Sequence, residues 1–220
     1  MTKRLLTTIL ALGCTLFVTA QATHAQGFEA TARGGVNYAS LVGIDGTTPK
    51  MGYYAGLGAN LFFGEHWGIG SEATLSGQGV CCEPNEAGVA MNYHYDYLNV
   101  PLLLHFQFEL GKAHTLRFSA GAQMGLFLVG RYDYTAPSIF GEGLLKGSGE
   151  LDKESFHPVD FGASLGAQWI LWECVALEVR YTLGITQTHN GISNTLNDYY
   201  HISVPDNRNS VLQIGAALSF

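Results

Sequence analysis

The sequence predicts an all-β protein, an eight-stranded antiparallel up-and-down transmembrane β-barrel. Hydrophobic residues alternate with small or polar residues along eight segments, and the connections between these segments are alternately short and long. Charged residues make up only 13% of the chain, and 28 of its 220 residues are glycine. This composition excludes a coiled coil and a typical disordered chain. A net charge of −7 provides no basic surface for nucleic acid.

The first 25 residues have the layout of a secretory signal peptide, in which a short basic region precedes an apolar stretch and then small residues. We expect cleavage between Ala25 and Gln26, with cleavage after Ala22 as the alternative. An uncleaved membrane anchor is a third interpretation, which the downstream small-residue sites disfavour. The chain is therefore divided into a signal peptide (1–25) and one barrel domain (26–220).

The eight segments follow one another through the whole barrel domain. They cover about residues 28–38, 53–63, 67–75, 98–108, 116–128, 159–169, 175–183 and 212–220. Four longer connections, at about 41–50, 77–92, 135–156 and 186–207, alternate with short turns. In outer-membrane barrels the short turns lie in the periplasm and the long loops lie outside, so we expect both termini to be periplasmic.

The face opposite the apolar one distinguishes a membrane barrel from a soluble, lipocalin-like barrel. A soluble barrel would carry long polar side chains there, and lysine especially, but we place the four lysines of the mature chain in loops or turns. This face is instead rich in glycine and small polar residues, which fit the narrow interior of an eight-stranded barrel.

Charged residues share this small-residue face. They are Glu29, Arg33, Glu72, Arg117, Asp160, Glu178 and Arg180. An arginine that faces lipid would cost about 2–4 kcal/mol at the bilayer midplane, whereas buried charges persist when they are paired and hydrogen-bonded. We therefore expect an interior network of ion pairs in place of an apolar core.

Aromatic residues near the strand ends predict two interfacial girdles. Near the short turns lie Phe63, Trp67, Phe106, Phe108, Trp169, Trp172 and Phe220. Near the long loops lie Tyr38, Tyr53, Tyr95, Tyr132, Tyr134 and Tyr181.

Three short motifs resemble a known family. Residues 97–104 (YLNVPLLL), 160–167 (DFGASLGA) and 180–185 (RYTLGI) are similar, in order and spacing, to strands of the PorT-like outer-membrane β-barrel proteins. The resemblance implies insertion by the barrel-assembly machinery, which reads a C-terminal strand that ends in an aromatic residue, here Phe220. It also implies no enzymatic activity and no cofactor.

The remaining chemistry-bearing residues give few signals. Cys81 and Cys82 are adjacent in a long connection, and both a vicinal disulfide and free thiols remain open, whereas Cys174 falls at the opposite end of the barrel. No histidine has the spacing of a metal site, and His105 shares the interior parity, where we expect a hydrogen bond. Ser71 lies on the opposite, lipid-facing side, which disfavours a nucleophile–base pair.

The sequence thus leads to three functional hypotheses for an integral protein of the bacterial outer membrane. The first is a structural, adhesive or partner-docking role of a monomeric barrel through its surface loops, with membrane lipid and an envelope protein as partners. The second is a component of a protein secretion or envelope assembly system. The third is a lipid-modifying enzyme.

Overall fold

The computed structural model describes residues 27–42, 47–84, 88–111, 113–137, 143–151, 157–172, 174–186 and 208–220. The expected signal peptide and its cleavage site between Ala25 and Gln26 lie outside these ranges. The described residues form nine strands. They are β1 (Phe28–Val42), β2 (Thr47–Phe63), β3 (Trp67–Cys82), β4 (Ala90–Glu109), β5 (His114–Pro137), β6 (Leu144–Glu150), β7 (Val159–Leu171), β8 (Val175–Gly184) and β9 (Arg208–Ser219). No helix in these ranges is long and apolar enough to cross a membrane.

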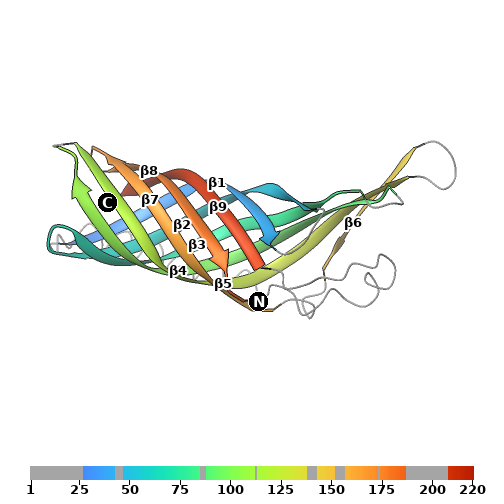
Figure 1. Ribbon diagram of the computed structural model, residues 1–220, viewed down its shortest axis with the longest axis horizontal. Coiled ribbons are helices and arrows are strands. Elements are labelled where there is room, and N and C mark those ends of the chain that lie inside the picture. Colours follow the sequence, from blue (N-terminus) through green and yellow to red (C-terminus); the bar gives the residue numbers. More distant parts are fainter. Residues whose placement is uncertain are drawn as a thin grey trace, which may run out of the picture.

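Eight of the strands close into a ring, which confirms the predicted fold (Figure 1). Strands β1 to β5 and β7 to β9 each pair antiparallel with the next, and β1 pairs with β9 from Thr31–Ser219 to Val42–Arg208. Closure leaves no sheet edge in this ring, which is the condition for a sheet to cross lipid. At the short-turn end, Gly64 and Gly111 adopt positive φ angles of 74° and 124°, which side chains disfavour.

The ninth strand was not predicted. The connection 135–156, expected to be a loop, contains β6, which pairs with the distal end of β5 from Arg131–Glu150 to Pro137–Leu144. The distal parts of β4 and β5 also pair with each other as far as Ala90–Thr135. Together β4, β5 and β6 project beyond the ring as a three-stranded extension (Figure 1). We call this part of the three strands the β4–β5–β6 extension.

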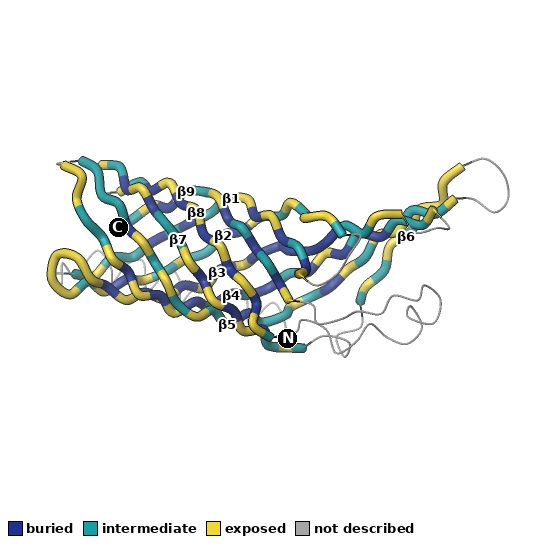
Figure 2. Tube along the Cα trace, viewed as in Figure 1, coloured by how far each residue is buried: buried dark blue, intermediate teal, exposed yellow. Residues whose placement is uncertain are grey.

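Buried and exposed residues alternate along the ring strands (Figure 2). The exposed residues of this alternation are mostly apolar. Leu57, Leu165 and Leu177 are 52%, 64% and 50% exposed, and similar exposure recurs on every strand of the ring. Charged and amide side chains instead occupy the interior, where Arg117 and Glu72 are each 4% exposed. This arrangement is the reverse of a soluble barrel and suits a surrounding of lipid chains.

The interior also contains an apolar cluster at its long-loop end. It consists of Leu41, Val80, Met91, Tyr93, Tyr95 and Tyr97. Tyr95 is 2% exposed and therefore does not belong to the outer aromatic girdle in which we expected it. Tyr132 packs against the cluster as well, because Leu128 has no partner on β4 and this β-bulge exchanges the two faces of β5 beyond it.

Candidate functional site

Near the short-turn end, Arg117 and Glu29 form a two-pronged ion pair across the interior. Both guanidinium NH2 groups donate to the carboxylate, with N–O distances of 2.8 Å. Arg117 also donates to Gln107 Oε1 at 3.0 and 3.1 Å, and its guanidinium lies 4.6 Å from the ring centre of Phe62. Asn60 donates a further hydrogen bond to Glu29 at 2.8 Å. The buried charges are thus paired and hydrogen-bonded, as a low-dielectric interior requires.

At mid-height, four charged side chains form one cluster. Arg180 donates two hydrogen bonds to Glu72, at 2.7 and 2.8 Å. Arg33 lies 2.7 Å from Glu72 and 3.4 Å from Glu178. Tyr54 on β2 donates to Glu178 on β8 at 2.8 Å, and its side chain passes over Gly35 of β1 and Gly215 of β9. Two guanidinium groups therefore face two carboxylates, and the cluster is electrically balanced.

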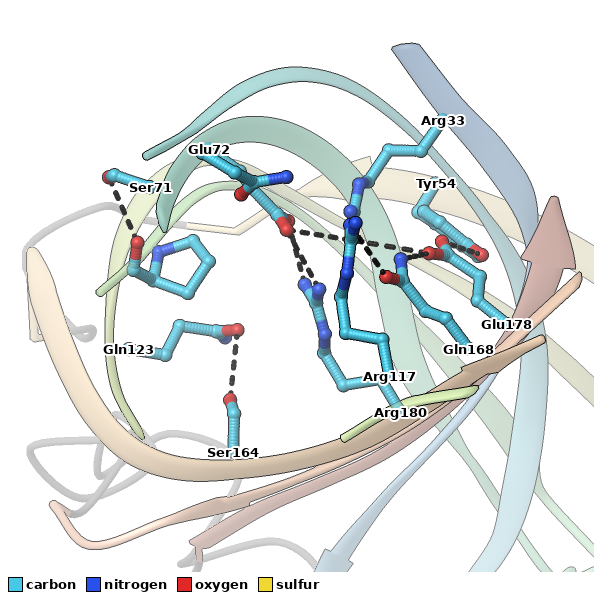
Figure 3. A network of polar contacts seen from close by, with 12 residues as sticks. Arg33, Tyr54, Ser71, Glu72, Arg117, Gln123, Ser164, Gln168, Glu178 and Arg180 are labelled. Atoms are coloured by element: carbon cyan, nitrogen blue, oxygen red, sulfur yellow. Dashed lines mark hydrogen bonds and ion pairs between the residues drawn. The ribbon is translucent and has the colours of Figure 1, made fainter. Parts of the chain in front are cut away.

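Gln168 connects these two groups. Its amide nitrogen donates to Glu178 at 2.8 Å, and its amide oxygen lies 3.5 Å from the guanidinium of Arg117 (Figure 3). The alternation along β7 already places Gln168 inside the barrel. Only the closed ring shows that Gln168 bridges the mid-height cluster and the Arg117–Glu29 pair near the short turns. Figure 3 shows the charged side chains reaching toward one another from several strands of the wall.

Asp160 stands apart from both charge clusters. It is 8% exposed, and its carboxylate accepts hydrogen bonds from Thr186 Oγ1 at 2.6 Å and from Asn209 Nδ2 at 2.9 Å. No ion pair joins it to a lysine, arginine or histidine among the described residues. The structure therefore brings together six of the seven charged residues singled out in the sequence and leaves the seventh separate.

His105 lies inside the barrel, as its parity indicates, and is 2% exposed. Its ring packs 6.1 Å from that of Phe62. The expected hydrogen bond is absent, since neither ring nitrogen has a hydrogen-bond partner within the described chain. Ser71 is exposed on the outer face and donates to the carbonyl oxygen of Pro101 at 2.9 Å. The two side chains lie on opposite faces of the barrel wall and cannot form a nucleophile–base pair.

The outer surface carries a polar belt that our sequence analysis missed. We call Lys50, Tyr53, His94, Asp96, Arg131 and Asp133 the rim belt. Tyr53 donates to Asp96 at 3.3 Å, and Arg131 pairs with the same carboxylate at 3.0 Å. The ring of Tyr53 reaches β4 by crossing β3 at Gly77, where a Cβ would lie 2.6 Å from the ring.

The second half of the rim belt has the same design. Lys50 Nζ lies 2.7 Å from His94 Nε2, which is 3.0 Å from Asp133. The Lys50 side chain crosses β3 at Gly79. Outward-facing residues of β4 are apolar from Leu98 to Phe108, whereas the two outward positions before them are the polar residues His94 and Asp96. This change from polar to apolar was the sequence signal from which the rim belt could have been predicted. The rim belt thus marks the end of the lipid-facing surface.

Two lysines lie in strands and not in the loops or turns where we expected them. Lys50 belongs to β2, which begins earlier than its alternating segment, and Lys146 belongs to β6, which was not predicted. The other two lysines, at positions 112 and 153, fall outside the described residues.

The three cysteines in the described ranges, Cys81, Cys82 and Cys174, are not joined by disulfides in the structure. Cys81 and Cys82 pair in register with Asn92 and Met91 of β4. Successive side chains of a strand point to opposite faces, and Cys82 packs against the interior apolar cluster. We therefore propose that Cys81 and Cys82 are free thiols, because a vicinal disulfide would disturb this pairing. Cys174 is exposed at a short turn.

Phe220 lies at the seam where the ring closes. Its backbone N–H donates to the carbonyl oxygen of Ala30 at 2.9 Å, and its carbonyl oxygen accepts from the N–H of Ala30 at 3.2 Å. The side chain is 51% exposed. Among the described residues, no group of three or more histidine, cysteine, aspartate or glutamate side chains could hold a metal ion.

A closed ring of eight antiparallel strands, apolar outside and ion-paired inside, defines an outer-membrane β-barrel. Residues 19–190 match the family described as "Outer membrane protein beta-barrel domain". The chain belongs to this family and is an integral protein of the bacterial outer membrane. No curated protein matches the sequence.

Similar solved structures are small outer-membrane proteins. Ail of Yersinia pestis, solved in complex with the heparin analogue sucrose octasulfate, is 14% identical, with a TM-score of 0.44 over 89% of this chain and 100% of that one. Neisserial surface protein A is 12% identical, with a TM-score of 0.43 over 89% and 98%. OprG of Pseudomonas aeruginosa is 16% identical, with a TM-score of 0.42 over 88% and 96%. Likeness at this level carries no information about a shared ligand.

Proposed function

We propose that the protein is a monomeric membrane anchor that docks to another protein of the cell envelope through the β4–β5–β6 extension. The observation that carries the proposal is the position of β6. Six residue steps separate Glu150, opposite Arg131 of the rim belt, from Leu144 at the distal end. At about 3.3 Å per residue, the strand extends roughly 20 Å past the rim.

The distal end of the extension has the character of a contact surface. Leu144 and Leu145 are 65% and 48% exposed, and Tyr134 on the paired strand is 38% exposed. Apolar side chains on the ring strands face lipid, but the three exposed side chains of the extension lie beyond the rim belt. Leu145 shares one face of the extension with Tyr134, and Leu144 lies on the opposite face. Exposed apolar residues outside the lipid zone are typical of protein-binding sites.

In-cell photo-crosslinking tests the proposal. A photoreactive amino acid replaces Leu145 in the extension, and the matched control replaces Leu165, which is 64% exposed on the lipid-facing surface of β7. We expect a protein adduct of defined mass from position 145 and none from position 165. Position 145 without any protein adduct, in cells where the barrel is correctly inserted, would contradict docking through the extension.

A component of a secretion or assembly system is the second candidate, and the resemblance of residues 97–104, 160–167 and 180–185 to PorT-like proteins favours it. Replacing residues 133–148 by an Asn-Gly turn would join the paired residues Tyr132 and Gly149 directly and remove the distal extension. Loss of export of other proteins, with the barrel still folded, would favour the machine component. Normal export would favour the anchor.

The lipid-modifying enzyme has the weakest support of the three hypotheses. Ser71 and His105 lie on opposite faces of the wall, and buried ion pairs occupy the middle of the barrel. We therefore propose a non-enzymatic role without a cofactor. Periplasmic termini and recognition of Phe220 during insertion remain part of the same proposal.

A further inference from the structure

Within the described residues, the interior charges of the barrel do not balance. Arg117 is matched by Glu29, and the mid-height cluster sets two guanidinium groups against two carboxylates. Three arginines and four carboxylates therefore leave one negative charge, and the structure places it on Asp160. An unpaired carboxylate is strongly unfavourable when it is buried in a low-dielectric interior. A compensating positive charge beside Asp160 would remove this cost.

A small polar chamber adjoins the Asp160 carboxylate. Its volume is about 10 Å3, which is room for a single water-sized particle. The chamber is lined by Gln78, Tyr97, Asn99, Gln123, Gly125, Asp160, Gly162, Thr182, Gly184, Asn209 and Val211. Seven of these eleven residues have amide, hydroxyl or carboxylate oxygens in their side chains, and the other four are three glycines and a valine.

One of the lining side chains carries a buried polar atom without a partner. Gln78 is 5% exposed, and its amide nitrogen donates to Ser76 at 3.2 Å while its Oε1 has no hydrogen-bond partner in the described chain. Buried polar groups in native proteins are nearly always satisfied. The unsatisfied oxygen of Gln78 and the unbalanced charge thus border the same chamber.

We propose that this chamber binds one small monovalent cation, with sodium as the best fit. Oxygen donors suit a hard cation. A single positive charge neutralises Asp160, whereas a divalent ion would leave an excess positive charge in the interior. The Asp160 carboxylate supplies the charge, and Gln78 Oε1 is the neutral ligand that is otherwise unused. Larger organic cations such as choline exceed the chamber.

Thermal unfolding of the full-length barrel in vesicles tests the proposal. Sodium chloride is exchanged for choline chloride at constant ionic strength, so that general screening does not change. A ligand that binds only the folded state raises the folded-to-unfolded ratio by about tenfold for each tenfold rise in its concentration above the dissociation constant. We expect this dependence with sodium and not with choline.

Two variants and one control assign the effect to the chamber. Asp160→Asn keeps the shape of the side chain and removes its charge, so we expect the sodium dependence to disappear while stability in choline chloride rises. Gln78→Met removes the free oxygen and should weaken the sodium dependence without abolishing it. Asp133→Asn removes an exposed carboxylate of the rim belt and should leave it unchanged.

Other results would overturn the proposal. Equal stability in sodium and choline chloride means that the chamber holds only water. A sodium dependence that stays as strong as in the wild type in both Asp160→Asn and Gln78→Met places the ion elsewhere. If Asp160→Asn fails to fold, 23Na relaxation of the wild-type protein and of Gln78→Met decides the question, since a bound ion broadens the signal and its absence refutes the site.

Discussion

Removing the guanidinium of Arg117 while Glu29 stays in place is the sharpest test of the interior network. Arg117→Met retains most of the side-chain volume but eliminates two hydrogen bonds of 2.8 Å to Glu29 and two of 3.0 and 3.1 Å to Gln107. Breaking a buried ion pair from one side costs about 3–5 kcal/mol. The Glu29 side chain is 19% exposed and keeps its bond from Asn60, so we expect a loss of about 3 kcal/mol in the free energy of unfolding.

A double-mutant cycle separates the ion pair from simple loss of packing. Glu29→Gln removes the charge that Arg117→Met would strand, so the double variant should recover about 2 kcal/mol of the summed single losses. Arg131→Met is the control, because its ion pair with Asp96 is 59% and 27% exposed, and exposed pairs contribute less than about 1 kcal/mol.

Urea unfolding in lipid vesicles provides the measurement. The three tryptophans of the chain, Trp67, Trp169 and Trp172, lie exposed on the lipid side near the short turns, and their fluorescence shifts to longer wavelength when the barrel unfolds into water. Strictly additive single losses, or an Arg117→Met variant as stable as wild type, would refute the assignment of this pair to a structural network.

Three further predictions follow from the same structure. Leu165→Arg, at a lipid-facing site 64% exposed near the middle of β7, should cost about 2–4 kcal/mol in the urea assay; Leu145→Arg in the extension should change stability by less than about 0.5 kcal/mol, and equal costs would contradict the membrane boundary. Gly68→Val should cost about 1–3 kcal/mol, because a Cβ at Gly68 would lie 2.5 Å from the Phe62 ring; an unchanged unfolding midpoint would show that the ring is free to move. Maleimide labelling of the unfolded, unreduced mature protein should modify Cys81, Cys82 and Cys174; modification of Cys174 alone would restore the vicinal disulfide.

The wall of the barrel could be predicted from the sequence because its determinants are local. Alternation with a period of two fixes which side chains share a face. The outward residues carry few charges, which indicates that this face meets lipid rather than water. The same parity placed Arg33, Arg180 and Glu72 inside. It would also have placed Tyr95 inside, had the parity of β4 been weighed above the position of Tyr95 near the strand end.

The partners of these residues depend on contacts that no local pattern contains. Glu29 and Arg117 are 88 residues apart in the sequence, and Glu72 and Arg180 are 108 residues apart. They meet because the stagger and tilt of the closing strands set which side chains share a level of the interior. The bulge at Leu128 could not be predicted from a local pattern either. One unpaired residue there exchanges the inward and outward faces of the rest of β5.

The sequence by itself determined the number of ring strands, the lipid-facing surface and the charged interior, since each depends on the chemistry of residues two apart along a strand. Only the tertiary structure decided that β6 lengthens the outer end, that the rim belt crosses β3 at two glycines, and that Asp160 is the one interior carboxylate without a guanidinium among the described residues. The reason is that ring closure brings side chains from distant strands to the same level of the barrel interior. Which arginine pairs with which carboxylate can be decided only after these levels are known.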